Sequence, residues 1–312
     1  MLLLLAALTA GLLVPVPDHV RPAVNDAASV GVAVLFLSYG LRLPTSEVLA
    51  GVRNVVLQGA ILASTFVVFP LLGLLLSLVA APVIGPELAA GVLFLSVLPS
   101  TVQGSVALTS IAKGNVPAAI TAATLSNVLG MILTPVLVLW LMDASANAGL
   151  GGLRSVLGQL LLPFIVGQLL SRWAGAWIRR RKALTVALDR GVIMFMLFNA
   201  VSAATAQGVW AQVHWSMLVV VAAISLAVLT GTTASLWFLS PHLRLGAEER
   251  TVLTLCGSQK SLATGLPIGA VLFAPTTLAT LVVPLIIYHQ LQLIAGAVLA
   301  RRIAKGSASD AP

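Results

Sequence analysis

The sequence predicts an all-α polytopic membrane protein with ten transmembrane helices in two inverted five-helix repeats, in which discontinuous helices 4 and 9 cross. Three observations lead to this prediction. The chain is 59% hydrophobic and only 8% charged, whereas a soluble domain carries about 25% charged residues. Two polar stretches interrupt apolar segments half a chain apart. The basic residues fall almost entirely between alternate apolar segments, as the positive-inside rule requires.

Composition also argues against several classes of protein. Solidly apolar runs, without period-two alternation, are not typical of a membrane β-barrel. The single cysteine rules out an internal disulfide and a Cys-rich metal site, and the four histidines are scattered. The net charge of +8 is explained by basic loops, so we expect no nucleic-acid partner. We also expect no cofactor, with sodium as the one doubtful candidate. The sequence displays no carboxylate pair and no Ser-His-Asp set of the kind that would indicate an enzyme.

Five apolar segments are expected in the first half. The first is short, since a spanning helix needs about 20 apolar residues. A signal peptide is the alternative for it, although no basic residue precedes the run. The third segment ends at a turn containing Pro82 and Pro86, and the fifth begins at Pro117, a favourable first-turn position for proline. The expected ranges are 2–17, 27–43, 55–79, 87–113 with an interruption at 99–105, and 117–140.

A linker rich in Gly, Ala, Ser and Asn, 144–152, separates these from five further segments. Their expected ranges are 153–173, 192–207, 217–239, a ninth segment that follows Glu248–Arg250 and contains the second interruption, and 278–300. The chain thus divides into a first repeat (1–143), the linker, an inverted second repeat (153–305) and a cytoplasmic tail (306–312).

The placement of Lys and Arg sets the orientation. If the segments alternate, fourteen basic residues lie on one side and only Arg21 and Arg154 on the other, while Lys260 lies inside a segment. This asymmetry predicts that both termini are cytoplasmic. The residue usage suits a GC-rich bacterium, so we expect a multi-pass protein of the plasma membrane, which is the bacterial inner membrane.

The two interruptions are Pro99–Ser105 and Leu255–Pro267, whose Gln103 and Gln259 are 156 positions apart in a chain of 312. Chance placement of Gly and Pro is the alternative. Two broken helices that meet at the midplane would form a small polar centre. The expected substrate- or ion-binding residues are Ser100, Thr101, Gln103, Ser105, Ser126, Asn127, Ser258, Gln259, Lys260, Ser261 and His289. For His289 the alternative is a packed histidine bonded to a neighbouring helix.

Two glycines within the interruptions, Gly104 and Gly257, are expected to permit close helix crossing. Gly73 lies in an uninterrupted segment and is expected to tolerate replacement better.

Several motifs carry a resemblance to a known family. They are Leu98–Gln103, Ala107–Val116, Leu125–Asn127, Leu133–Pro135, Cys256–Ala263 and His289–Ile294. With them the chain resembles the bile acid:sodium symporter superfamily, and more closely its sodium-bile-acid-symporter-like (SBF-like) branch, over nearly its whole length. The resemblance implies a core of the third to fifth and eighth to tenth helices, a panel of the other four, and a substrate cavity between core and panel.

One departure from the family concerns sodium. The sodium-coupled members carry a glutamate in the ninth helix that serves their sodium sites. Matching Gln259 to the family's glutamine places Leu255 at the glutamate position and Lys260 where those members have an uncharged residue, while Ser126 and Gln259 still match sodium-site positions.

We therefore expect a secondary transporter that moves a small organic anion or amphipathic solute by alternating access and is not classically sodium-coupled. One alternative is a non-transporting membrane regulator or scaffold that retains the fold. The other is a sodium-coupled bile-acid-like symporter. The expected partners are a small-molecule solute and the lipid bilayer.

Lys260 lies at least ten residues from either end of its segment, and every carboxylate is expected outside the segments. We expect the Lys260 ammonium to stand in the place of a sodium ion as a tethered cation. Its expected acceptors are the side-chain oxygens of Gln103, Ser126 and Asn127 together with freed backbone carbonyls.

Overall fold

The computed structural model describes residues 2–43, 54–142 and 149–309, and its regular structure there is entirely helical. The α-helices are α1 (Leu2–Leu13), α2 (Arg21–Arg42), α4 (Val55–Ala63), α5 (Phe69–Ser96), α6 (Gln103–Ile111), α7 (Val116–Leu141), α8 (Gly149–Arg180), α9 (Lys182–Ala206), α10 (Trp215–Leu239), α11 (Ala247–Gly257), α12 (Leu262–Leu272) and α13 (Pro275–Ser309). A π-helical turn, Ser64–Val68, joins α4 to α5, and a short 3₁₀ helix, Val209–Gln212, precedes α10.

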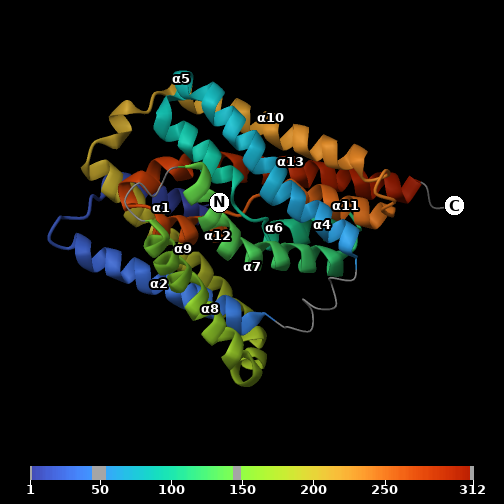
Figure 1. Ribbon diagram of the computed structural model, residues 1–312, viewed down its shortest axis with the longest axis horizontal. Coiled ribbons are helices and arrows are strands. Elements are labelled where there is room, and N and C mark those ends of the chain that lie inside the picture. Colours follow the sequence, from blue (N-terminus) through green and yellow to red (C-terminus); the bar gives the residue numbers. More distant parts are fainter. Residues whose placement is uncertain (1, 44–53, 143–148, 310–312) are drawn as a thin grey trace.

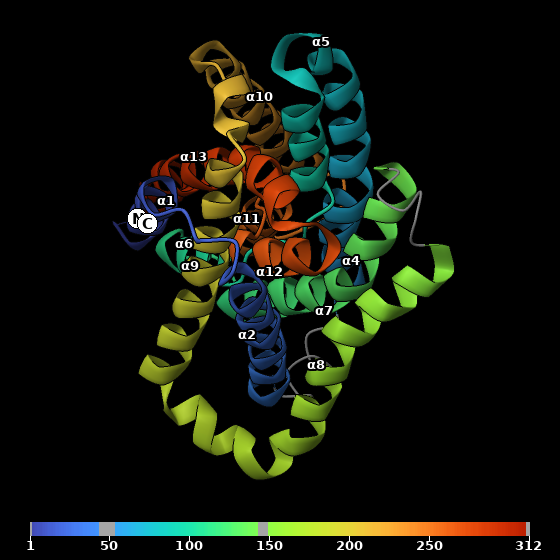
Figure 2. The ribbon, with the colours of Figure 1, turned by 90° about the vertical axis from the view of Figure 1, so that its left-hand side faces the viewer.

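Seven helical stretches among the described residues are long and apolar enough to cross a membrane, so the protein is a multi-pass membrane protein. One of them, Val55–Ser96, contains 42 residues and turns sharply at Gly85 (Figure 2). Gly85 has φ 79° and ψ 157°, a conformation that is essentially restricted to glycine. The turn expected near Pro82 and Pro86 is therefore present, and α5 supplies both the end of the third segment and the start of the fourth.

Some expected boundaries were wrong. The seventh segment was expected to start at residue 192, but α9 begins at Lys182, because Asp189 is paired within the protein and does not mark a loop. Residues 149–152 of the expected linker already belong to α8, and 306–309 of the expected tail belong to α13. The remaining linker residues, 144–148, lie outside the described residues.

The helices form two groups. Figures 1 and 2 show α2, α8 and α9 together on one side of the molecule and α5, α10 and α13 together on the other. Helices α2 and α8 approach very closely at two glycines. A Cβ atom on Gly40 would lie 2.1 Å from the Phe164 carbonyl oxygen, and one on Gly167 would lie 2.2 Å from the Leu37 carbonyl oxygen. Small residues at a helix crossing permit such an approach between membrane helices.

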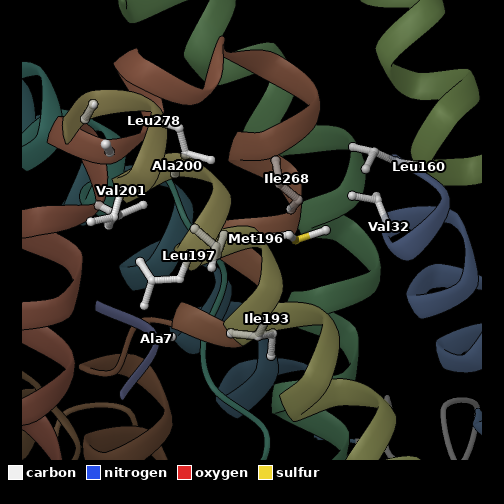
Figure 3. Packing of buried hydrophobic residues seen from close by; sticks show 14 of the residues in the cluster. Ala7, Val32, Leu160, Ile193, Met196, Leu197, Ala200, Val201, Ile268 and Leu278 are labelled. Carbon is white, nitrogen blue, oxygen red and sulfur yellow. The ribbon is translucent and has the colours of Figure 1, made fainter. Parts of the chain in front are cut away.

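An apolar cluster joins the two groups. It combines Val32 of α2, Leu160 of α8 and Met196 of α9 with Ile268 of α12 and Leu278 of α13, all of them buried (Figure 3). Because interiors are close-packed, this cluster fixes the position of α9 against α12.

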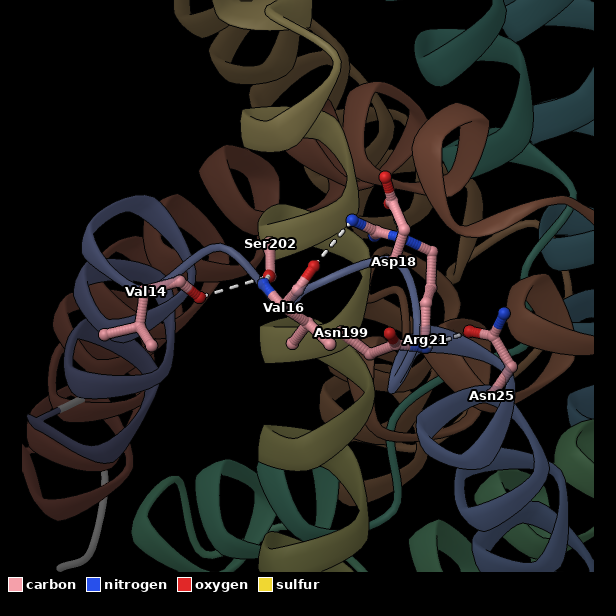
Figure 4. A network of polar contacts seen from close by, with 7 residues as sticks. All are labelled: Val14, Val16, Asp18, Arg21, Asn25, Asn199 and Ser202. Carbon is pink, nitrogen blue, oxygen red and sulfur yellow. Dashed lines mark hydrogen bonds and ion pairs between the residues drawn. The ribbon is translucent and has the colours of Figure 1, made fainter.

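The N-terminal segment is anchored on α9. Helix α1 has 12 residues and is therefore about 18 Å long, too short to span a hydrocarbon core of about 30 Å. After it, the chain is held by Ser202, which accepts from the Val16 N–H (2.7 Å) and donates to the Val14 carbonyl (3.2 Å) (Figure 4). Arg21 donates to the Val16 carbonyl (2.8 Å) and pairs with Asp18 (3.2 Å). These contacts fix α1 relative to α2 and α9.

Candidate functional site

The two predicted interruptions lie against each other. Helix α5 ends at Ser96 and α6 begins at Gln103, while α11 ends at Gly257 and α12 begins at Leu262. The Ser261 N–H donates to the Pro99 carbonyl (2.8 Å), and the Ser100 hydroxyl donates to the Cys256 carbonyl (2.5 Å). The two unwound segments are therefore joined by direct hydrogen bonds.

The carbonyls at the end of α5 and in the first part of the break are satisfied by donors from other elements. Five consecutive carbonyls, those of Ser96 to Ser100, accept hydrogen bonds from other elements. The donors, in order, are Lys260 Nζ, Thr134 Oγ1, Lys260 Nζ, the Ser261 N–H and Asn127 Nδ2, at 2.7–2.8 Å. In a membrane an irregular backbone is tolerated only where such partners exist.

The second break is satisfied in the same way. The Gly257 carbonyl accepts from Ser64 Oγ (2.8 Å) and the Ser258 carbonyl accepts from the Tyr288 hydroxyl (2.7 Å). Gln292 contacts both backbone polar groups of Lys260. Its Oε1 accepts from the Lys260 N–H and its Nε2 donates to the Lys260 carbonyl, each at 2.8 Å. Tyr288 and Gln292 were missing from the predicted set, although both belong to the polar cluster around His289 that the sequence displays.

The Lys260 side chain is completely buried and points away from most of the predicted site. Its ammonium donates to the carbonyls of Thr65 (2.8 Å), Ser96 (2.7 Å) and Leu98 (2.8 Å). The ring of Phe69 covers it, with 4.2 Å from Nζ to the ring centroid. Three acceptors match the three N–H donors of an ammonium group.

The predicted acceptors of Lys260 were thus partly wrong. Freed backbone carbonyls do hold the ammonium, but the oxygens of Gln103, Ser126 and Asn127 do not. The sequence could not show that the third carbonyl comes from the segment before α5.

The π-turn explains why the Thr65 carbonyl is available. In a π-turn the Phe69 N–H bonds to the Ser64 carbonyl instead of the Thr65 carbonyl. The next residue, Pro70, has no N–H to offer. The Thr65 carbonyl therefore lacks a donor within its own helix, and Lys260 supplies one. The Ser96 carbonyl is free for a related reason, since it lies at the C-terminal, partially negative end of α5.

Ser126 and Gln259, the two positions that match sodium sites, are occupied by internal hydrogen bonds, and so is their neighbour Asn127. The Ser126 hydroxyl oxygen accepts from the Ser100 N–H (2.9 Å), Asn127 Oδ1 accepts from the Thr264 hydroxyl, and Gln259 Oε1 accepts from the Ser105 hydroxyl (3.2 Å). Leu255, at the glutamate position, is buried in an apolar cluster with Leu108, Ala112 and Ala300. Within the described residues no group of three or more His, Cys, Asp or Glu side chains is placed to hold a metal ion.

A large cavity of about 990 Å³ lies beside the crossing. Its walls come from α1, α2, α8 and α9 on one side and from α6, α7, α12 and α13 on the other, which is the position that the family resemblance implies. The predicted residues that line it are Thr101, Gln103, Asn127, Ser261 and His289. The other predicted residues, Ser100, Ser105, Ser126, Ser258, Gln259 and Lys260, do not line it and instead stabilise the two breaks.

Two helix N-termini form the part of the cavity next to the crossing, which we call its inner end. Residues Thr101–Gly104 open α6 and residues Ser261–Thr264 open α12, and all of them line the cavity. Ser261 caps α12 by accepting from the Thr264 N–H (3.1 Å), and Thr101 accepts from the Gly104 N–H (3.0 Å). The Gln103 amide is exposed to the cavity and forms no hydrogen bond with any residue that the structure describes. Helix N-termini carry partial positive charge and unpaired N–H groups, so this end favours an anion.

Charged residues line another part of the cavity, which we call its outer end. They are Arg42, Arg179, Asp189 and Arg190. Arg42 pairs with both carboxylate oxygens of Asp189, at 2.9 and 2.7 Å, and its guanidinium lies 4.9 Å from the ring centroid of Tyr39. The expectation that every carboxylate lies outside the helical segments was therefore wrong. Asp26, Glu87 and Asp189 all lie within helical stretches that are long and apolar enough to cross a membrane, and of these three only Asp189, in α9, is buried.

Comparison with known proteins places the chain in a transporter family. Residues 1–305 match the profile of the SBF-like CPA transporter family. The chain is 39% identical over 306 residues to "Uncharacterized protein PA2026" of Pseudomonas aeruginosa, covering 97% of this chain and 92% of that protein. It is 36% identical over 282 residues to "Putative symporter YfeH" of Escherichia coli, covering 90% and 85%. It is 30% identical over 275 residues to "Sodium/bile acid cotransporter 7" of Danio rerio, covering 86% and 82%.

Proposed function

The chain belongs to the SBF-like CPA transporter family, and from this premise we propose that it is a secondary transporter that moves a small organic anion or amphipathic solute by alternating access. It is a membrane transporter of a small molecule and not an enzyme.

The observation that carries this proposal is the cavity with two helix N-termini at its inner end. The N-termini of α6 and α12 carry partial positive charge, and no carboxylate lines this end of the cavity within the described residues. This end therefore suits one anionic group of a solute. The walls beyond them include the apolar side chains of Ile120, Val128 and Phe164, which are not fully buried, and side chains of this kind suit an apolar body. A solute with an anionic head and an apolar body fits both ends of this surface.

Alternating access needs two arrangements of the same helices around one site. We propose that residues 1–143 and 153–305 are inverted repeats, related by an axis through the crossing. The hydrogen bond between Ser100 and Cys256 supports this, because these residues are 156 positions apart, the same offset as Gln103 and Gln259. Residues that lie on a two-fold axis contact their own equivalents.

The basic residues support an orientation for the proposed repeats. Arg42, Arg179 and Arg190 belong to the side that carries fourteen basic residues by the alternation of segments, which would be the cytoplasmic side, with both termini. In this orientation the cavity faces the cytoplasm and the described state is inward-facing. The proposed location is the bacterial inner membrane.

Coupling is the point on which this chain departs from a sodium symporter. The Lys260 amino group donates to three carbonyls at the crossing, and Leu255 supplies no carboxylate; these contacts support the proposal that Lys260 acts there as a tethered cation. We propose that sodium does not bind at this crossing in the unaltered protein. A sodium-coupled bile-acid-like symporter remains the alternative that the name of the Danio rerio relative suggests.

A thermal-shift panel tests the proposal on the purified protein. Amphipathic monocarboxylates should raise the melting temperature, and the rise should shrink in Gln103→Leu, which removes the amide at the α6 N-terminus. Gln212→Leu is the matched control, since Gln212 is exposed in the short helix before α10. If no carboxylate in the panel shifts either protein, the alternative of a non-transporting regulator or scaffold is favoured.

A further inference from the structure

We propose that Arg179 and Arg190 form a second anion subsite at the outer end of the cavity, so that the preferred substrate is a dianion with an apolar body between its two charged groups. This inference rests on the proposed function, because it assigns the first anionic group to the N-termini of α6 and α12.

The charges at the outer end are unbalanced. Three arginines and one aspartate line this part of the cavity. The Asp189 carboxylate is taken up by Arg42, which contacts both of its oxygens. Among the residues that the structure describes, no carboxylate lies within ion-pair distance of Arg179 or Arg190. Two full positive charges on exposed side chains are therefore available to a ligand in the same cavity.

The chain makes room for the Arg179 guanidinium. A Cβ atom at Gly175 would lie 2.7 Å from Arg179 Nη1 and 2.9 Å from the Leu41 carbonyl oxygen. The absence of a side chain at Gly175 lets the guanidinium fold back along α8 toward the end of α2, which lines the cavity. A larger residue there would displace it.

An apolar stretch separates the two anion-binding ends. On α8, the partly exposed Phe164 and Arg179 both line the cavity, and fifteen residues of helix separate them by about 22 Å. On α9, Ile193 and Met194 follow Arg190 into the cavity. A ligand that reaches from the α12 N-terminus to Arg190 must cross this apolar surface, and an alkyl or ring system between two acidic groups satisfies it.

Topology alone could account for basic residues at this end, since cytoplasmic loops are rich in Lys and Arg. The neighbours of Arg179 are examples of basic residues that can set the topology without facing the cavity. Arg181 stacks on Trp177, with 4.4 Å from the guanidinium carbon to the ring centroid, and neither Arg180 nor Arg181 lines the cavity. Arg180 therefore provides a matched control on the same helix turn.

The experiment compares α,ω-dicarboxylates with monocarboxylates of the same chain length. Dissociation constants are measured with the full chain in nanodiscs of zwitterionic lipid, so that no anionic headgroup competes. Since an arginine–carboxylate contact is a strong, charge-assisted interaction, we expect the best diacid to bind about tenfold more tightly than its monoacid. Arg179→Gln and Arg190→Gln should each lower this diacid-to-monoacid ratio toward one, whereas Arg180→Gln should leave it unchanged.

The outcomes separate the two proposals. If monoacids bind and diacids bind no better at any length, the second subsite is wrong and the proposed anion transporter stands. If Arg180→Gln lowers the ratio as much as Arg179→Gln, the preference is a general effect of surface charge and the subsite is also wrong. If neither class of acid binds, both proposals are overturned.

Discussion

Replacing Lys260 is the most informative perturbation of the crossing, because one side chain serves three buried carbonyls. In Lys260→Met the side chain at this position remains long and apolar but loses all three hydrogen-bond donors. Each buried acceptor left without a partner costs about 1–3 kcal/mol, and the lost contact with the face of Phe69 adds about 2 kcal/mol. Against this, the variant no longer buries a charge, which by itself costs several kcal/mol.

The balance favours the lysine, since all three of its donors are used at 2.7–2.8 Å. We expect Lys260→Met to lose about 3 kcal/mol of stability, which lowers the melting temperature by roughly 5 °C for a chain of 312 residues. The assay is thermal unfolding of the purified protein, followed by intrinsic fluorescence.

Lys260→Ala adds a test of the tethered-cation idea. The shorter side chain exposes the carbonyls of Thr65, Ser96 and Leu98 to a space that a small cation can enter. We expect sodium or methylammonium to restore part of the melting temperature of Lys260→Ala, and to change neither Lys260→Met nor the unaltered protein. A sodium-dependent rise in the unaltered protein that potassium does not reproduce would refute the idea and favour ordinary sodium symport.

Four further predictions concern other parts of the molecule. Reporter fusions should read cytoplasmic after Leu43, Lys182 and Arg302 and external near Asp18, Pro86 and Ala146, the last of which lies outside the described residues; a cytoplasmic signal at the third external site would contradict the inverted repeats. Gln292→Leu should lower stability by about 2–4 kcal/mol in thermal unfolding, because both polar groups of the Lys260 peptide lose their partner. Gly104→Leu should impair folding or solute binding more than Gly59→Leu, since a Cβ at Gly104 would lie 2.9 Å from Thr101 Oγ1 whereas nothing lies within 4 Å at Gly59; equal tolerance would mean that the crossing is looser than described. Asp189→Asn should destabilise by about 1–3 kcal/mol, because Arg42 loses a partly buried counter-charge, and Asp18→Asn, whose carboxylate is exposed, is its control in the same unfolding assay.

The choice of Gly59 as control reflects what the sequence could not show. Gly73 was expected to be the tolerant glycine because its segment is uninterrupted. A Cβ atom there would lie 2.1 Å from Ser96 Oγ. Gly73 therefore packs directly against the other arm of α5, beyond the turn at Gly85, and the expectation was wrong. Uninterrupted hydrophobicity identifies a spanning helix, but it carries no information about which face touches a neighbour.

Helices and breaks were predictable because the bilayer imposes simple rules on composition. Apolar runs and the clusters of Pro, Gly and Ser at 99–105 and 255–267 located α5, α6, α11 and α12. Boundaries at charges were less predictable. Asp189 and Arg190 suggested a loop, whereas Arg42, distant in the sequence by 147 residues, supplies the partner that lets α9 continue through them.

The candidate site was predictable in its membership but not in its orientation. Sequence reasoning placed Gln103 and Lys260 in one polar centre, yet Gln103 faces the cavity and Lys260 faces the opposite way, toward Thr65. The direction of a side chain beyond a helix break depends on local backbone angles that no periodicity encodes. Gln292 was missed because an amide in an apolar helix has no visible partner until the Lys260 peptide lies beside it.

The π-turn between α4 and α5 determines which changes in the length of this segment keep its two helices in register. Buried residues recur every four positions through it, at Leu57, Ile61, Thr65, Phe69, Gly73 and Ser77. In an uninterrupted α-helix, such a stripe would drift by about 40° at each step, and the extra residue of the π-turn removes about 100° of that rotation.

Deleting Val67 would thus convert the π-turn to a plain α-helical turn and leave the rotation of α4 against α5 nearly unchanged, so Ser64 would still face the Gly257 carbonyl that it now contacts. Inserting one more residue would instead turn α4 by about 100° against α5. Substitutions at the outward-facing Val67 and Val68 leave this rotation unchanged. The segment is therefore expected to accept replacements on its lipid face and the loss of one residue at the π-turn, but not the gain of one.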